Sequence, residues 1–298
     1  MMYHNSVLLN ESVDFLSIRP DGTYVDATYG GGGHTRAILD RLTSGRVIAF
    51  DQDAEAIQNR IDDPRLIMVN NNFRFLRNFL MLHRALPVDG VMADLGISSH
   101  QIDQPERGFS TRFEGALDMR MDQRKGLTAR EVVNKYGEEK LSDLFRVYGE
   151  IQNARRLASL LVVNRKNNSI ETTTELKEIA QNCAMRGKEN KYLAQVFQAL
   201  RIEVNQEIDA LKELLVQASD CLKPGGRLVV IAYHSLEDKL VKNFFRSGNF
   251  EGRIEKDFFG NILAPLHMVT RRAMVSPAGE IEKNSRSRSA RLRVAEKK

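Results

Sequence analysis

Hydrophobic and polar positions follow two alternating patterns along the first third of the chain. Short β-branched or apolar runs are followed by stretches with apolar residues three and four positions apart. This order of strand, helix and strand predicts a parallel sheet with crossover helices, and therefore an α/β doubly wound fold. The expected strands are 23–28, 46–50, 65–69 and 88–95, and the expected helices between them include 34–42 and 53–61.

The next convincing strand comes much later, at 226–233, and is entered through the turn "KPGG". A crossover between parallel strands needs only a dozen or so residues, so the roughly 130 residues before this strand indicate an insertion. We therefore predict a discontinuous domain, 1–103 with 204–298, and an inserted helical substrate-recognition domain, 104–203. The helical patterns of the insert lie at 129–137, 140–149, 153–165 and 173–184.

A sustained apolar stripe begins at Tyr192 and predicts a long helix that returns the chain to the first domain, with a break near Asn205. On another face of this helix Arg201 and Asn205 follow the helical spacing together with Gln198. Such a polar face usually meets water. The alternative is that Arg201 and Asn205 help to position a substrate.

The chain ends in a basic tail, 283–298, which holds seven Lys or Arg and one Glu against a net charge of +5 for the whole protein. Localised positive charge favours nucleic acid, although a charged tail is often simply solvated. In "SARLRVAE" the apolar residues Ala290, Leu292 and Val294 alternate with Arg291 and Arg293. This pattern predicts a half-buried final strand with its arginines outward.

Composition restricts the remaining possibilities. The 298 residues are 42% hydrophobic, enough for a sizeable core. No apolar run has the length of a membrane span and no signal peptide is evident, so we expect a cytoplasmic protein without a membrane partner. Cys183 and Cys221 are far apart and lack neighbouring ligands, which argues against a disulfide framework and against a metal site.

Four glycines, 30–33, separate the first expected strand from its helix. A dinucleotide fingerprint would need a third glycine where Thr35 stands. Asp26 followed by Gly30, Gly32 and Gly33 instead resembles the S-adenosylmethionine pocket of doubly wound methyltransferases. Asp51, at the end of the second strand, would accept hydrogen bonds from ribose hydroxyls. Its alternative role is a helix N-cap, for which Asp53 is better placed.

Longer motifs follow one another through nearly the whole chain. Together they resemble the bacterial small-subunit (16S) ribosomal RNA cytosine-N4 methyltransferase family. The resemblance implies a class I, Rossmann-like enzyme that transfers the methyl group of S-adenosyl-L-methionine to the exocyclic N4 of a cytidine in the decoding centre of 16S rRNA, within the small ribosomal subunit. The motifs are "HNSVLLNE" (4–11), "TYGGGGHT" (28–35), "DLGISSHQID" (94–103), "ERGFS" (106–110), "LDMRMD" (117–122), "FQALRIEVN" (197–205), "LKPGGRL" (222–228), "YHSLED" (233–238) and "SRSRSARLRVAEK" (285–297).

The same resemblance implies which residues contact the cofactor. Phe73 would offer a stacking face for adenine, although most phenylalanines are ordinary core. His100 and Tyr233 depart from the residues that many members have at these positions. The implied cofactor contacts are Gly32, Gly33, His34, Asp51, Phe73, Asp94 and Gln101.

Methylation of cytosine N4 needs an acceptor for the amino protons and good alignment, and it needs no metal. Asp94 is the candidate catalytic acceptor, in competition with its cofactor role. His234 and Ser235 follow the fifth strand and could touch the base. In the alternative interpretation "HSLED" starts a helix, with Ser235 as its cap and Asp238 at the third position. The candidate stacking platforms for a flipped base are Phe109, Tyr192 and Tyr233.

Two other classes of protein compete with this interpretation. A nicotinamide oxidoreductase shares the sheet and the acidic residue, but it predicts the missing third glycine. A non-catalytic RNA-binding protein explains the basic tail and leaves the glycine loop unexplained. The sequence leaves open the nucleotide modified, the choice between free rRNA and the assembled subunit, and whether the protein is a homodimer.

Overall fold

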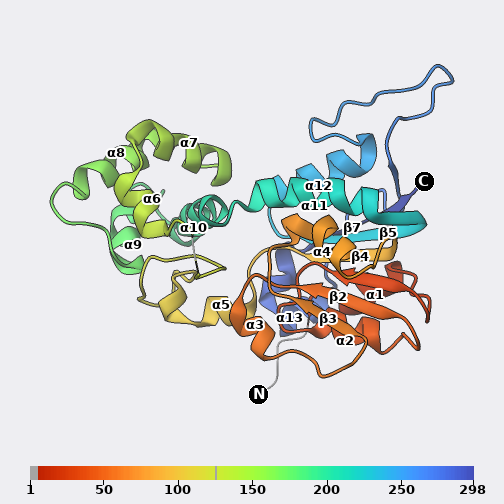
Figure 1. Ribbon diagram of the computed structural model, residues 1–298. Helices are drawn as coiled ribbons and strands as arrows, with labels where there is room; N and C mark the ends of the chain where they lie inside the picture. Colours follow the sequence, from red (N-terminus) through yellow and green to blue (C-terminus); the bar gives the residue numbers. More distant parts are fainter. Residues whose placement is uncertain (1–5, 125) are drawn as a thin grey trace. The chain divides into compact units, whose positions relative to one another are not determined.

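The computed structural model describes residues 6–124 and 126–298 (Figure 1), so His4 and Asn5 of the first motif lie outside the described residues. The chain forms two compact units. One is Met1–Gly96 with Ile208–Lys298, and the other is Ile97–Glu207. The insertion therefore begins earlier and ends later than the range 104–203 expected from the helical patterns.

The first unit is built on one seven-stranded sheet with the order β3-β2-β1-β4-β5-β7-β6. Strands β1 to β5 are parallel, and β7 runs antiparallel to both β5 and β6. The α/β doubly wound, mostly parallel sheet expected from the sequence is thus confirmed. The strands are β1 (Thr23–Asp26), β2 (Arg46–Phe50), β3 (Leu66–Val69), β4 (Val88–Asp94), β5 (Leu222–Ala232), β6 (Leu266–Met268) and β7 (Arg291–Lys297).

Both faces of the sheet are covered, which explains why its central strands are apolar at consecutive positions. Ile48 and Phe50 of β2 pack on one face with residues of α4, α11 and α12. Val47 and Ala49 point to the other face and pack with residues of α1 and α2. The helices of this unit are α1 (Leu9–Phe15), α2 (Gly33–Leu39), α3 (Ala54–Gln58), α4 (Leu76–Leu82), α11 (Glu207–Cys221), α12 (Ser235–Ser247) and α13 (Ala278–Lys283), with 3-10 turns η1 (Phe73–Phe75) and η3 (Ser285–Ser289).

The final strand exists, but the prediction that it is half-buried with both arginines outward is wrong. Because β7 lies between β5 and β6 in a sheet covered on both faces, four successive residues from Leu292 are buried. Arg291 is exposed, whereas Arg293 is buried and donates two hydrogen bonds to Asp238, at 2.7 and 3.0 Å. A buried arginine is tolerated here because a carboxylate matches its planar fork.

The second unit is helical. Its core joins residues of five helices, among them Leu141, Leu157 and Val196. Two helices begin with capping boxes in which Thr128 pairs with Glu131 and Thr172 with Glu175. The elements are α5 (Ser99–Asp103), η2 (Pro105–Arg107), α6 (Ala129–Lys135), α7 (Glu138–Tyr148), α8 (Ala154–Asn164), α9 (Thr173–Gln181) and α10 (Glu189–Asn205).

The predicted break in the long helical segment is confirmed. Helix α10 ends at Asn205, Gln206 adopts a left-handed conformation with φ 51°, and α11 begins at Glu207. Over the described residues, no helix combines the length and the apolar character that crossing a membrane requires.

Candidate functional site

The glycine loop between β1 and α2 is tightly packed. Gly30 and Gly32 have φ of 51° and 77°, a region that favours glycine. A Cβ on Gly32 would lie 2.7 Å from the Tyr29 hydroxyl, and one on Gly33 would collide with Ser6. Packing against Tyr29 and Ser6 therefore already requires glycine at positions 32 and 33, before any ligand is considered.

Asp26 ties the end of β1 to α2. One of its carboxylate oxygens accepts a hydrogen bond from Thr35 Oγ1 at 2.7 Å, and the other accepts from Thr28 N at 3.1 Å. The Thr28 hydroxyl in turn accepts from Asp94 N at 2.7 Å. These bonds hold the carboxyl ends of β1 and β4 together, at the edge of a parallel sheet where ligands usually bind.

Asp51, which follows β2, reaches back to the glycine loop. Its Oδ2 accepts from Gly30 N at 2.8 Å and its Oδ1 from Asp53 N at 2.9 Å. Burial raises the pKa of Asp51 to about 6, although the two backbone hydrogen bonds act to lower it. The carboxyl group is therefore mainly ionised at neutral pH. A carboxylate has about four acceptor sites, so capacity for two further donors is left.

The prediction that Asp53, and not Asp51, caps the next helix is confirmed. Asp53 accepts from Glu55 N at 3.1 Å at the start of α3. Phe73 lies in η1 after β3, where its half-buried ring packs against the core beside β2. The partial exposure leaves part of the ring free for a flat ligand.

Three side chains meet beyond β1, β4 and β5, and we call His34, Asp94 and Tyr233 the carboxylate cluster. The Tyr233 hydroxyl donates to Asp94 Oδ1 at 2.7 Å. Asp94 Oδ2 lies 3.9 Å from His34 Nδ1, beyond hydrogen-bond distance. Within the described part of the chain, Oδ2 has no donor, although the side chain is only 21% exposed.

The protonation state of the carboxylate cluster follows from its geometry. His34 Nε2 lies 3.2 Å from the carbonyl oxygen of Val7, which can only accept, so Nε2 carries a proton. Burial raises the pKa of Asp94 to about 6, while His34 and Tyr233 act in the opposite direction. Burial and the neighbouring carboxylate raise the pKa of Tyr233 well above 10. Tyr233 therefore stays a donor, and Asp94 exchanges a proton near neutral pH.

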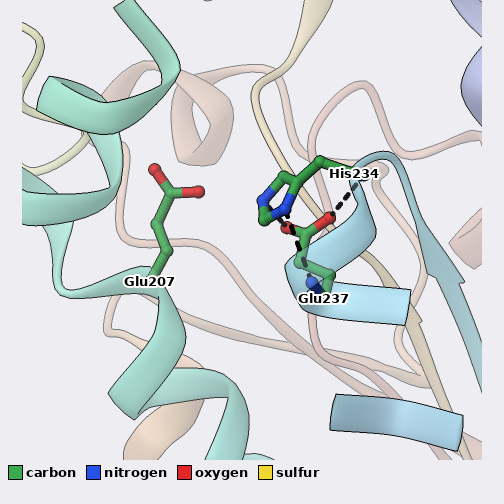
Figure 2. A group of neighbouring side chains, drawn as sticks. All are labelled: Glu207, His234 and Glu237. Carbon is green, nitrogen blue, oxygen red and sulfur yellow. Dashed lines mark hydrogen bonds and ion pairs between the residues drawn. The ribbon is translucent and has the colours of Figure 1, made fainter. Parts of the chain in front are cut away.

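His234 caps α12, so the prediction that Ser235 is the cap with Asp238 at the third position is wrong by one residue. Glu237 N donates to His234 Nδ1, and Glu237 Oε2 accepts from the backbone of Tyr233 at 2.9 Å and of His234 at 3.3 Å. Figure 2 shows the His234 ring beside the Glu237 carboxylate. An imidazole nitrogen can replace a hydroxyl as a cap because it accepts from the same backbone N–H.

The comparisons with known proteins decide the family. A model of the MraW methylase family matches residues 1–298, the whole chain. The chain belongs to the MraW methylase family. It is 56% identical to a ribosomal RNA small subunit methyltransferase H of Bacteroides thetaiotaomicron, with 100% of this chain and 98% of that protein covered. A protein of the same name from Christiangramia forsetii is 54% identical, with 100% and 98% covered.

Superposition on the crystal structure of an rRNA methylase from Streptococcus thermophilus gives a TM-score of 0.44 at 13% identity, over 100% of this chain and 98% of that one. This likeness is too weak to add to the family match.

In the helical unit of this methylase, Asn205 forms what we call the amide latch. Its Nδ2 donates to the carbonyl oxygens of Met119 at 2.8 Å and Arg201 at 2.9 Å, and its Oδ1 accepts from Met121 N at 2.8 Å. Arg201 donates two hydrogen bonds to Glu207, the acidic residue also labelled in Figure 2. The expected polar face of α10 is therefore not solvated, because internal partners engage it.

Gln101 has a local role in the same unit, where it forms a capping box with Ser98 at the start of α5. Phe109 is buried, and Tyr192 packs against the same core and donates to Asn153 Oδ1 at 2.9 Å. Both aromatic residues thus have packing roles in the core of the helical unit.

Sequence reasoning missed the way that Tyr233 and His34 converge on Asp94. Asp94 ends β4, Tyr233 follows β5 and His34 lies in the first turn of α2, after the glycine loop that follows β1. The only available signal was that all three come after parallel strands. It also missed Asp238 as the partner of Arg293, because a buried ion pair between residues 55 positions apart leaves no local pattern.

Proposed function

We propose that this methylase transfers a methyl group from S-adenosyl-L-methionine to the exocyclic N4 of a cytidine in small-subunit ribosomal RNA, in the cytoplasm. The relatives are ribosomal RNA small subunit methyltransferases, which supports the RNA substrate. The observation that carries the chemistry is the half-buried Asp94 carboxylate, which has one oxygen held by Tyr233 and the other open. The decoding centre as the target and the small subunit as the context rest on the family resemblance.

The residues at the sheet edge fit the proposed cofactor. Asp51 has spare acceptor capacity for the two ribose hydroxyls, and it is held in place by Gly30 N and Asp53 N. Phe73 has a partly exposed ring for adenine. The remaining proposed contacts are Gly32, Gly33, His34, Asp94 and Gln101.

The bound cofactor would supply an activated methyl group on a sulfonium. The cytosine amino group is a weak nucleophile because its lone pair is delocalised into the ring, so the protein must orient it and accept its proton. Asp94 Oδ2 is suited to that task. The Tyr233 hydroxyl holds the other oxygen and orients the carboxylate, while the His34 ring, 3.9 Å from Oδ2, favours its negative charge.

The proposed substrate residues fall into two groups, those that could contact the base directly and those that could act only through other residues. His234 and Ser235 begin α12 directly after Tyr233, so a base held at Asp94 would lie near them. Arg201 and Asn205 are engaged inside the helical unit. We therefore propose that Arg201 and Asn205 act on the cytidine indirectly, by holding the backbone around Met119 and Met121 in place.

The test combines binding and mapping. Calorimetric titration of the protein with S-adenosylmethionine and with NAD separates a methyltransferase from an oxidoreductase, because only the former should bind S-adenosylmethionine. Modified cytidines in 16S rRNA are then mapped in cells with the gene, without it, and with the Asp94→Asn variant. We expect one N4-methylated cytidine to disappear without the gene and to stay absent with the variant. An unchanged modification pattern in the deletion strain would overturn the proposal.

A further inference from the structure

A cavity of about 280 Å³ lies in the sheet unit at the start of α12. It is formed by segments far apart in the sequence, the end of β5 with the start of α12 and the chain that leads into β7. Among its lining residues are Tyr233, His234, Ser235, Asp238, Arg288 and Arg291. No cofactor or base contact proposed above needs the two arginines.

The charge balance of this cavity is positive. Asp238 is the acidic residue of its lining, and its carboxylate is held at both oxygens by the buried Arg293. Arg291 Nη1 lies 3.6 Å from the same carboxylate and is 56% exposed. Arg288 is exposed, and within 6–124 and 126–298 no acidic partner is found for it. The buried Arg293 therefore already neutralises the one carboxylate of the lining, which leaves the charges of the lining residues Arg288 and Arg291 largely uncompensated.

His234 lines the cavity as the N-cap of α12. Because its Nδ1 accepts from Glu237 N, the proton of the neutral ring resides on Nε2, which is buried 3.2 Å from Glu237 Oε1. The first turn of α12 already holds the carboxylates of Glu237 and Asp238, so the exposed arginines, and not the helix N-terminus, supply the positive charge of the cavity.

Tyr233 connects this cavity to the carboxylate cluster, since it lines the cavity and also donates to Asp94. We propose that the cavity binds one phosphodiester group of the RNA strand, next to the nucleotide whose base is presented to Asp94, with Arg288 and Arg291 as its main ligands. The inference rests on the proposed function. A phosphate of the chain fits because guanidinium groups match its oxygens and because a base would leave the arginine charges without a counterion.

The experiment uses the full-length protein and a labelled synthetic RNA hairpin that carries the target cytidine in its loop. Dissociation constants are measured over a salt series for the wild type, Arg288→Ala, Arg291→Ala and the control Arg77→Ala. Arg77 is exposed on α4 and does not line the cavity. We expect each cavity variant to bind about tenfold more weakly, with a salt slope smaller by about 0.7, the value for one contact to a single-stranded phosphate. The control should bind like the wild type.

Two further measurements keep the inference separate from the proposed function. The affinity for S-adenosylmethionine should stay unchanged in the cavity variants, and a loss there would overturn the assignment to RNA. Methyl transfer by the wild type tests the proposed function by itself. If the wild type transfers methyl groups while both cavity variants keep its RNA affinity and salt slope, the phosphate site is wrong and the proposed function stands.

Discussion

The carboxylate cluster of the sheet unit and the amide latch of the helical unit both bury polar side chains, but they differ in how many hydrogen bonds remain to be made. In the amide latch Asn205 uses both of its N–H donors and one acceptor site within the protein. In the carboxylate cluster Asp94 receives one hydrogen bond on Oδ1, and Oδ2 has no donor in the described part of the chain.

This difference separates polar groups that maintain the fold from those available to a ligand. A buried polar group whose partners are complete stabilises the structure, and removing it leaves those partners unsatisfied. A buried carboxylate with an open oxygen costs free energy, which shows here as the raised pKa of Asp94. Substitutions in the two clusters should therefore affect different properties.

The largest effect is expected for Asp94→Asn. The amide retains an acceptor for the Tyr233 hydroxyl but cannot take up a proton, so the rate of methyl transfer should fall about 100-fold or more. The melting temperature should not fall, because a buried charge is removed. The measurement is the incorporation of labelled methyl groups into ribosomal RNA at saturating cofactor. Activity within threefold of the wild type would contradict a role in proton acceptance.

Next comes Asp51→Ala, which should lower the affinity for S-adenosylmethionine by about 10- to 100-fold. Asp51 also holds Gly30 N and Asp53 N, so some stability should be lost as well. Asp53→Ala is the matched control, because loss of the α3 cap should cost about 1 kcal/mol of stability and leave cofactor affinity nearly intact. Equal affinities for the two variants would remove Asp51 from the ribose site.

A smaller effect is expected from Asn205→Ala. It leaves the Met119 and Arg201 carbonyl oxygens and the Met121 N–H without this partner, so urea unfolding should show a loss of about 2 kcal/mol. Under conditions where the variant is folded, its affinity for S-adenosylmethionine should match the wild type. An Asn205→Ala protein with full stability but impaired methyl transfer would instead support direct contact with the cytidine.

The smallest effect is the dependence on pH. The folded chain binds a proton at Asp94 between about pH 4 and 6 that the unfolded chain has released, so the contribution of this group to stability falls as the pH rises through that window. Methyl transfer should rise as the pH passes about 6, where the carboxylate of the folded enzyme forms. Comparing the wild type with Asp94→Asn at about pH 5 and about pH 7.5 isolates this group. Equal wild-type activity at both values would contradict the assignment.

The parallel sheet could be predicted because its strands and helices have local hydrophobic periods, as in β2 and α2. The break near Asn205 was also expected, although the apolar stripe continues across it through Val204 and Ile208. Strand β6, only three residues long, carries no such period, and its position beside β7 depends on tertiary pairing.

The candidate site was predictable only in part. Asp51 directly follows β2 and Asp94 ends β4, and this position signals a ligand edge in open α/β sheets. The burial of Arg293, the cap formed by His234 and the engagement of Asn205 depend on partners distant in the sequence or on local geometry that no residue pattern encodes. A polar residue at helical spacing predicts a polar face, but it does not identify what that face contacts.

The position of β7 has a consequence for the order of folding. This strand pairs inside the sheet with β5 on one side and β6 on the other. A folding chain in which β7 has not docked also leaves Asp238 without the arginine that neutralises it. The parallel strands β1 to β5 can therefore pair first, but the open edge of β5 and the charge of Asp238 are satisfied only once β7 is in place.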